Sequence, residues 1–194
     1  MVIIMKYPTR INNTKKNISY GNRGMTLEHE LNETNNFYLI NDIAVIHKKP
    51  TPITITKVDY PNRMEAVIKE AYFKTPSTTD YNGIYKGKYI DFEAKETKLN
   101  SFPISNIHNH QIEHLKKIID HGGISFLIVR FTIKNKTFLL ETKKLINYLS
   151  ESNKKSIPYS FFIENGYLIK DKFNPRVDYL EVINDIYFKE LKGE

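Results

Sequence analysis

The chain of 194 residues contains no cysteine. This absence excludes disulfide scaffolds, zinc–thiolate sites and thiol nucleophiles, and it fits a reducing compartment. Long hydrophobic runs are also missing, because the longest, Ile124–Val129, is interrupted at Ser125 and is far too short to cross a bilayer. The apolar segment Val2–Met5 lacks the length and the leading charges of a signal peptide. The sequence therefore predicts a soluble, cytoplasmic protein with no membrane segment.

Acidic residues are outnumbered, with 22 Asp and Glu against 29 Lys and Arg, which gives a net charge of +7. This excess favours a polyanionic partner such as nucleic acid, or a membrane surface. Hydrophobic residues make up 40% of the chain, enough to build a real core. The length suits one compact domain, and we expect it to span residues 25–194.

Residues 1–24 have the character of a flexible basic arm. The polar run Asn12–Asn17 has no periodicity, so this segment has no apolar face to bury against a core. Two interpretations stay open: a disordered tail, or an arm that becomes ordered on a phosphate backbone. On the second interpretation the candidate DNA-binding residues of the arm are Arg10, Lys15, Lys16 and Arg23.

Hydrophobic periodicity over the rest of the chain predicts alternating helices and strands. The segment 64–73 fits a helix or a strand and stays unresolved. The order of elements predicts an α/β fold, in which a central mixed β-sheet is flanked by helices. The expected helices are 25–41, 110–120, 143–149 and 178–191, and the expected strands are 44–47, 53–58, 80–85, 89–95, 124–131 and 137–141.

The hairpin of residues 80–95 carries the most informative chemistry. Side chains alternate between the two faces of a strand, so Asp91, Glu93 and Lys95 share one face and the apolar residues between them share the other. The return of the hairpin brings Asp80 close to this charged face. Carboxylates and one ammonium group are therefore expected to cluster on one side of the sheet.

Such a cluster suits metal-dependent hydrolysis of a phosphodiester. Mg²⁺ prefers carboxylate and other oxygen ligands, and it lowers the pKa of a bound water while offsetting charge on the phosphate. Lys95 could orient the attacking water or neutralise the developing charge. The alternative is a half-exposed hairpin with a solvated charged face, which would be the default for an isolated Glu-x-Lys. Asp80 across the turn and the basic net charge favour the metal site.

An acidic residue, about a dozen residues and then Glu-x-Lys resembles the pattern of the PD-(D/E)XK nuclease superfamily. One departure is Thr79, which stands where the superfamily often has proline. Longer strings resemble the RecU family of Holliday junction resolvases, over about residues 20–131. These strings are Gly21–Glu28, Asn32–Asn35, Ser77–Gly83, Tyr89–Lys98, Ser101–Pro103 and His110–His114.

The resemblance implies a restriction-endonuclease-like fold with a protruding stalk. It implies a homodimeric, Mg²⁺-dependent endonuclease, for which Mn²⁺ can substitute, that nicks two opposed strands of a four-way DNA junction during recombination and repair. The resemblance also implies a recombinase or branch-migration machinery as a further partner. By position, Thr78, Asp80, Glu93 and Gln111 match the family's metal site, and Lys95 matches its transition-state stabiliser.

The resemblance also places the stalk at about residues 50–75. Basic residues beside aromatic ones suit stacking on the unpaired bases at a junction centre. The alternative is that the aromatic residues belong to the core or to a dimer interface. The candidate DNA-binding residues here are Arg63, Tyr72, Phe73 and Lys74.

Several questions stay open at the level of sequence. His110 and His114 could bind zinc on one helix face, but no third ligand is evident. Asp91 could assist the site or bind the hairpin, and Glu28 could reach the site or remain on the surface. The competing functions are a nuclease of the same superfamily with another DNA target, and a non-catalytic DNA-binding protein.

Overall fold

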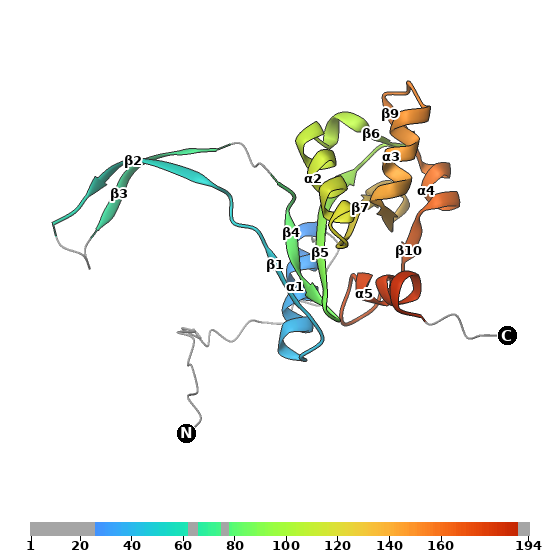
Figure 1. Cartoon of the computed structure of the whole chain (residues 1–194), viewed down its shortest axis with the longest axis horizontal. Helices are drawn as coiled ribbons and strands as arrows, with labels where there is room; N and C mark the ends of the chain where they lie inside the picture. The colour runs from blue at the N-terminus through green and yellow to red at the C-terminus, as the bar shows by residue number, and fades with distance from the viewer. Residues whose placement is uncertain (1–25, 62–65, 75–77, 190–194) are drawn as a thin grey trace.

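The computed structural model describes residues 26–61, 66–74 and 78–189. A central six-stranded sheet has the order β1-β4-β5-β7-β8-β10 (Figure 1). The sheet is mixed, because β5 and β7 run parallel whereas the other neighbours are antiparallel. Its strands are β1 (Val45–Lys48), β4 (Tyr81–Tyr85), β5 (Lys88–Thr97), β7 (Ile124–Phe131), β8 (Lys136–Glu141) and β10 (Tyr167–Ile169).

Helices cover both faces of this sheet, which confirms the predicted fold class. On one face, α1 and α5 pack with Phe126 and Ile128 of β7, and on the other face α2, α3 and α4 pack with Leu127 and Val129. Alternate residues of β7 thus pack into two separate hydrophobic cores, one on each face of the sheet. The helices are α1 (Leu27–Ile40), α2 (Asn109–Asp120), α3 (Thr142–Glu151), α4 (Tyr159–Asn165) and α5 (Tyr179–Ile183).

A column of aromatic rings fixes the strands that carry the charged hairpin. The ring of Phe92 is stacked between Tyr81 and Phe126, with a centroid separation of 4.8 Å on each side. Tyr179 of α5 packs against Phe92 and Phe126. The apolar face of β5 is therefore held firmly, and the charged residues between its members face the α2 side.

The hairpin between β4 and β5 turns tightly at Lys86 and Gly87. Both residues have positive φ, 47° and 73°, as a two-residue turn that matches the twist of the strands requires. The register places Tyr81 opposite Phe92 and Asn82 opposite Asp91. Continuing this register places residue 80 beside residue 93, as the sequence predicts.

The predicted first helix is present as α1, but the apolar stripe that helical spacing predicts for it, Leu27, Leu31, Leu39 and Ile40, is only partly buried. Leu27 and Leu31 are buried, whereas Leu39 and Ile40 are exposed. The stripe continues instead through Thr34, Asn35 and Tyr38, because the polar members of this set find partners. The Tyr179 hydroxyl donates to Asn35, and the backbone N–H of Val177 donates to Thr34.

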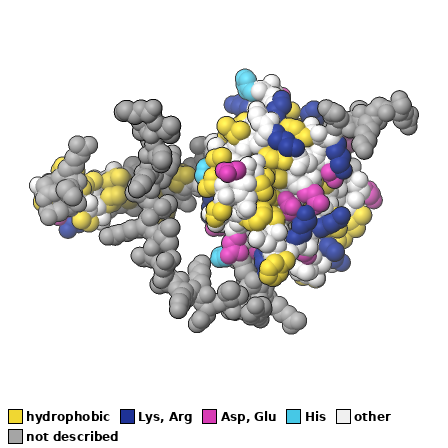
Figure 2. Space-filling model, turned by 90° about the horizontal axis from the view of Figure 1, so that it is seen from below, with side chains coloured by type: hydrophobic (Ala, Val, Ile, Leu, Met, Phe, Trp, Pro, Cys, Tyr) yellow, Lys and Arg dark blue, Asp and Glu magenta, His cyan; other side chains and the backbone are white. Residues whose placement is uncertain are grey.

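Strands β2 (Ile53–Asp59) and β3 (Val67–Phe73) form a two-stranded antiparallel ribbon that projects from the body (Figure 1). For the segment 64–73, whose sequence fits a helix or a strand, the structure shows a strand from residue 67. Every residue of both strands is exposed, so the alternation in β2 has no buried face within one chain. Figure 2 shows hydrophobic side chains on the surface of this ribbon.

Some elements differ from the expected ones. The last helix is shorter, because α5 ends at Ile183 and a π-helical segment, Asn184–Phe188, follows. The expected loop 101–109 contains β6 (Ser101–Pro103) and a 3₁₀ turn, Ile104–Asn106, and a second such turn, Thr132–Lys134, joins β7 to β8. β6 pairs with β9 (Ser156–Pro158). Three-residue strands that pair over such a separation leave no periodic signal.

Among the described residues, no helix is long and apolar enough to cross a bilayer. The predicted arm, including Arg10, Lys15, Lys16 and Arg23, lies outside the described residues, as does Arg63 of the stalk.

Candidate active site

The charged face of β5 lies against α2, as the strand alternation predicts. Asp91 and Glu93 are both fully buried, and Lys95 is partly exposed at the end of the row. Buried carboxylates are costly unless hydrogen bonds and opposite charges compensate them. The contacts that surround these two side chains therefore define the site.

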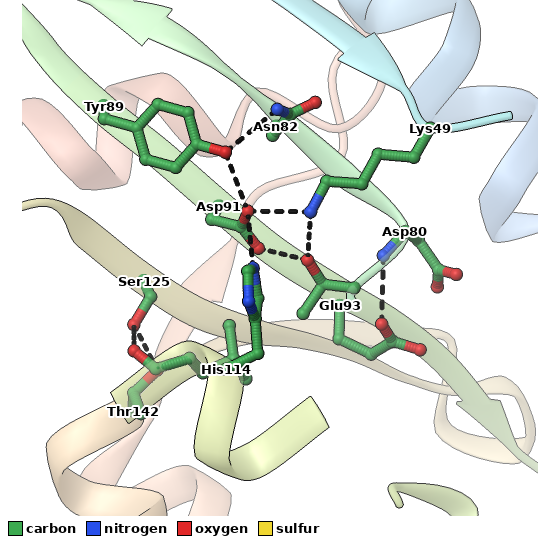
Figure 3. Close-up of polar contacts among 11 residues, drawn as sticks. Lys49, Asp80, Asn82, Tyr89, Asp91, Glu93, His114, Ser125 and Thr142 are labelled. Atoms are coloured by element: carbon green, nitrogen blue, oxygen red, sulfur yellow. Dashed lines mark hydrogen bonds and ion pairs between the residues drawn. The ribbon is translucent and has the colours of Figure 1, made fainter. Parts of the chain in front are cut away.

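Asp80 and Glu93 are joined directly. The backbone N–H of Asp80 donates to Oε2 of Glu93 at 3.0 Å (Figure 3). Oδ2 of Asp80 accepts from the backbone N–H of Ala94 at 3.4 Å. Each residue thus binds the other's strand, at the position where β4 begins. Two carboxylates that are 13 residues apart in the chain are held side by side.

The environment of Glu93 raises its pKa to about 7. Burial is the main cause, because it disfavours the charged carboxylate, and the negative charge of Asp80 adds to the effect. The ammonium group of Lys95 acts in the opposite direction. A carboxylate in this state readily exchanges a proton for a cation.

Lys95 completes the group of three. Its Nζ lies 2.5 Å from Oε1 of Glu93, while 27% of the Lys95 side chain remains exposed. The ammonium therefore contacts both the buried carboxylate and solvent. A positive charge so placed is available to a phosphate that approaches from outside.

Two adjoining cavities open the site to the surface. One, of about 480 Å³, is lined by Glu28, Asp80 and Lys95. The other, of about 380 Å³, lies at the root of the ribbon and is lined by Glu28, Lys49, Thr78 and Asp80. Glu28 therefore borders the site. The sequence alone did not decide between this position and a surface position away from the site. Asp80 and Glu28 line both cavities, and Lys95 lines the first.

The other two predicted metal residues have different surroundings. Thr78 borders the same cavity as Asp80 and is partly buried. Gln111 is buried at the start of α2, where its Oε1 accepts from the backbone N–H of His108 at 2.9 Å. Gln111 thus caps the helix that covers the site, and the structure gives it no hydrogen bond to Asp80 or Glu93.

The donor set fits a hard divalent cation better than zinc. In the described part of the chain, no three His, Asp or Glu side chains converge as a metal-binding group. Any cation bound at Asp80 and Glu93 must complete its shell with water or with neutral oxygens, as Mg²⁺ commonly does. His114 contacts Asp91 instead of pairing with His110, which leaves the zinc alternative without support.

Asp91 is the centre of a second polar network that sequence reasoning missed. Its Oδ2 contacts Nζ of Lys49 at 2.8 Å, Oη of Tyr89 at 3.1 Å and Nε2 of His114 at 3.1 Å, while Oδ1 accepts from the Thr79 hydroxyl (Figure 3). The available signals were the Lys48–Lys49 pair before the ribbon and the charged face of β5. Neither signal says which residues meet.

The candidate DNA-binding residues of the ribbon do not contact the charged cluster. Phe73 is 83% exposed, and Tyr72 is 59% exposed with its hydroxyl donating to Glu70. Lys74 is exposed, and its backbone N–H donates to Pro52. These residues are available on the surface of one chain, and their role in binding DNA stays a prediction.

Comparison with known proteins places this geometry in context. The sequence model of a family described as recombination protein U, RecU, matches residues 22–185. Relatives described as Holliday junction resolvase RecU are 55% identical over 177 residues, which is 89% of this chain and 88% of each relative. They include proteins of Bacillus cereus strain AH820 and Bacillus thuringiensis strain Al Hakam.

A solved structure of Hjc, a Holliday junction resolvase from Archaeoglobus fulgidus, is also similar. It is 13% identical in sequence with a TM-score of 0.41, and the match covers 68% of this chain and 87% of that one.

Proposed function

The chain belongs to the RecU family of Holliday junction resolvases, and on that premise we propose that the Asp80–Glu93–Lys95 cluster hydrolyses one phosphodiester in each of two opposed strands of a four-way DNA junction. The reaction serves recombination and repair. The protein is a crossover junction endonuclease, and its place of action is the cytoplasm. A recombinase or branch-migration machinery would supply and align the junction.

The carboxylates of Asp80 and Glu93 would hold Mg²⁺, for which Mn²⁺ can substitute. Thr78 lies beside Asp80 and could add its oxygen, and Gln111 could do so if its amide left the helix cap. When bound, the cation supplies Lewis acidity, which activates water and offsets charge at the scissile phosphate. Together, the two carboxylates would supply the negative charge that balances this cation.

Lys95 would act on the phosphate rather than on the cation. Its partly exposed ammonium borders the cavity that Asp80 also lines. There it can bind a non-bridging phosphate oxygen or position the attacking water, and the developing negative charge strengthens the contact. The observation that carries the proposal is that Asp80 and Lys95 line one cavity while both contact the buried Glu93. A protein that merely binds DNA has no need of this arrangement.

We propose that two copies form a twofold symmetric dimer. A four-way junction offers two equivalent scissile phosphates, and closed twofold symmetry supplies two equivalent sites. The exposed apolar side chains of the ribbon support this assembly, because an isolated two-stranded ribbon is marginally stable in water. These side chains are Ile53, Ile55, Val58, Val67 and Ile68.

Recognition of the branch point is assigned to the ribbon. An open junction exposes base faces on which Tyr72 and Phe73 can stack, with Arg63 and Lys74 beside phosphates. Linear duplex offers no such faces. Residues 1–24 would add phosphate contacts through Arg10, Lys15, Lys16 and Arg23.

The test is cleavage of a synthetic four-way junction compared with linear duplex of the same arm sequence, in Mg²⁺ and in EDTA. We expect paired symmetric nicks in the junction, little cleavage of the duplex, and binding without cleavage in EDTA. Comparable cleavage of the duplex would instead favour a nuclease with another target. Glu93→Gln serves as the inactive control.

The dimer is tested with a supercoiled plasmid that extrudes a cruciform. Wild-type dimers should linearise it, because both strands are cut before the junction collapses. Mixed dimers of wild-type and Glu93→Gln subunits should give nicked circles. Light scattering should report about twice the chain mass of 22.8 kDa, and a stable monomer that linearises the plasmid would contradict the proposal.

A further inference from the structure

Asp91 joins segments that lie far apart in the sequence. Although it is fully buried, it contacts Lys49 at the start of the ribbon, Thr79 at its end, and His114 on α2. Lys49 also donates to the Thr79 hydroxyl at 2.8 Å, so the side chains of Lys49, Thr79 and Asp91 all contact one another. One buried group thus ties both roots of the ribbon to β5 and to the helix above it.

Three of the segments that Asp91 joins, β5, α2 and the end of the ribbon, carry residues assigned to the metal site. Asp91 precedes Glu93 by two residues on the same face of β5. His114 follows Gln111 by three residues, so the two lie on neighbouring turns of one side of α2. Thr79 separates the remaining two assigned residues, Thr78 and Asp80.

Asp91 is poorly suited to bind a cation itself. Three groups already surround Oδ2, and the Thr79 hydroxyl donates to Oδ1. The ammonium of Lys49, 2.8 Å from Oδ2, is one of these four contacts, whereas the carboxylate of Glu93 has two, Lys95 at Oε1 and the backbone N–H of Asp80 at Oε2. The carboxylate of Asp91 is therefore satisfied by the protein, whereas Asp80 is only partly buried and lines both cavities.

We propose that Asp91 is a positioning residue that sets the separation between Asp80 and Glu93 by anchoring Thr79 and α2 to β5. The inference rests on the proposed function. Groups that orient metal ligands from outside the coordination shell typically change metal affinity or activity by about 10–100-fold when they are lost. Asp91 acts through the backbone of the segments that it joins.

The experiment measures binding of Mn²⁺ to the DNA-free protein by calorimetry, and cleavage of a four-way junction as a function of Mg²⁺ concentration. Asp91→Asn keeps the shape of the side chain but removes its charge. We expect Mn²⁺ affinity to fall about 10–100-fold. The Mg²⁺ concentration for half-maximal cleavage should rise by a similar factor, and excess Mg²⁺ should restore most of the rate.

The matched control is Asp178→Asn. Asp178 also accepts from a tyrosine and a lysine, Tyr38 at 2.7 Å and Lys172 at 2.8 Å, but it belongs to the opposite face of the sheet. Its loss should change thermal stability and leave the Mg²⁺ dependence at the wild-type value. The comparison separates positioning of the metal site from general stabilisation.

Folded Asp91→Asn with wild-type Mn²⁺ affinity and Mg²⁺ dependence would overturn the proposal. If that variant does not fold, Thr79→Val decides, since it removes one hydroxyl from the network. A weaker Mn²⁺ affinity in Thr79→Val supports the proposal, and an unchanged one overturns it. Glu93→Gln is measured in parallel, because unchanged Mn²⁺ binding there would remove the proposed metal site itself and the positioning role with it.

Discussion

The backbone N–H of Asp80 and Oε2 of Glu93 are 3.0 Å apart, and this contact holds the two carboxylates together before any cation arrives. Asp80→Asn and Glu93→Gln each remove one negative charge at nearly constant shape. We expect each to lower junction cleavage by at least about a hundredfold. Loss of a group that only hydrogen-bonds a metal ligand already lowers metal affinity or activity by about 10–100-fold. Junction binding in EDTA should stay close to wild type. A matched control is Glu164→Gln, on the exposed side of α4. Wild-type cleavage by Glu93→Gln would refute the assignment.

Lys95→Ala should reduce the cleavage rate at saturating junction and Mg²⁺ by about 10²–10³-fold, as the loss of one charge-stabilising group commonly does. Affinity for Mn²⁺ should not weaken, because the variant removes a positive charge that competes for Glu93. Lys170→Ala, an exposed lysine beyond β10, is the control and should cleave normally. A parallel loss of Mn²⁺ affinity in Lys95→Ala would indicate that the lysine organises the metal ligands instead.

The raised pKa of Glu93, about 7, predicts a pH-dependent cation affinity. The protonated carboxyl group must lose its proton to bind a cation, so affinity for Mn²⁺ should fall about tenfold per pH unit below pH 7 and level off above it. Calorimetry in two buffers of different ionisation enthalpy should detect release of close to one proton per cation at pH 6 and little at pH 8. Proton release by Glu93→Gln at pH 6 equal to that of wild type would assign the effect to another group.

Phe73→Ala should separate recognition of the branch from chemistry. Phe73 is 83% exposed, so the melting temperature should stay within a few degrees of wild type. Loss of one stacking contact, about 1–3 kcal/mol, should reduce the preference for junction over duplex by about 5- to 150-fold. Phe173→Ala is a matched control, because Phe173 is 91% exposed and lies outside the ribbon. A large loss of stability in Phe73→Ala would point to a dimer interface.

Phe92→Ala should destabilise the fold itself by about 3–5 kcal/mol, the usual cost of removing a buried aromatic ring. The ring is fully buried and stacked between Tyr81 and Phe126. Because it lies between Asp91 and Glu93 on the opposite face, the loss should also weaken the metal site. Chemical denaturation measures the loss of stability, and a change below about 1 kcal/mol would contradict the stacking of Phe92 between Tyr81 and Phe126.

Period-two alternation in β5 correctly predicted which side chains face the core, because a strand offers just two faces. The meeting of Asp80 with Glu93 was predictable too, since a tight turn fixes the register of a hairpin. In α1, helical spacing wrongly predicted that Leu39 and Ile40 are buried. Polar residues with tertiary partners occupy the buried positions instead. Local patterns carry no information about such partners.

The network around Asp91 shows the same limit. Lys49 and His114 are 42 and 23 residues from Asp91, and nothing in their local sequence marks them as its partners. For Gln111, similarity to a family assigns a role in the metal site that local sequence does not indicate. In this structure its amide oxygen caps a helix. The short strands β6 and β9 were missed because three residues are too few for a periodic signal.

The ribbon leaves and re-enters the body at hydrogen-bonded neighbours. The backbone N–H of Lys49 donates to the carbonyl of Asp80 at 2.7 Å, so β1 and β4 would still be adjacent if the chain between them were short. In the geometry of the sheet, the ribbon is an insertion into a β1–β4 hairpin, and its length adds little to the entropy of loop closure. Its sequence is therefore free to diverge without disturbing the strand that carries the carboxylates. On the proposed role of the ribbon, a change of branched substrate would require changes in this one segment, while the strand that carries the carboxylates stays as it is.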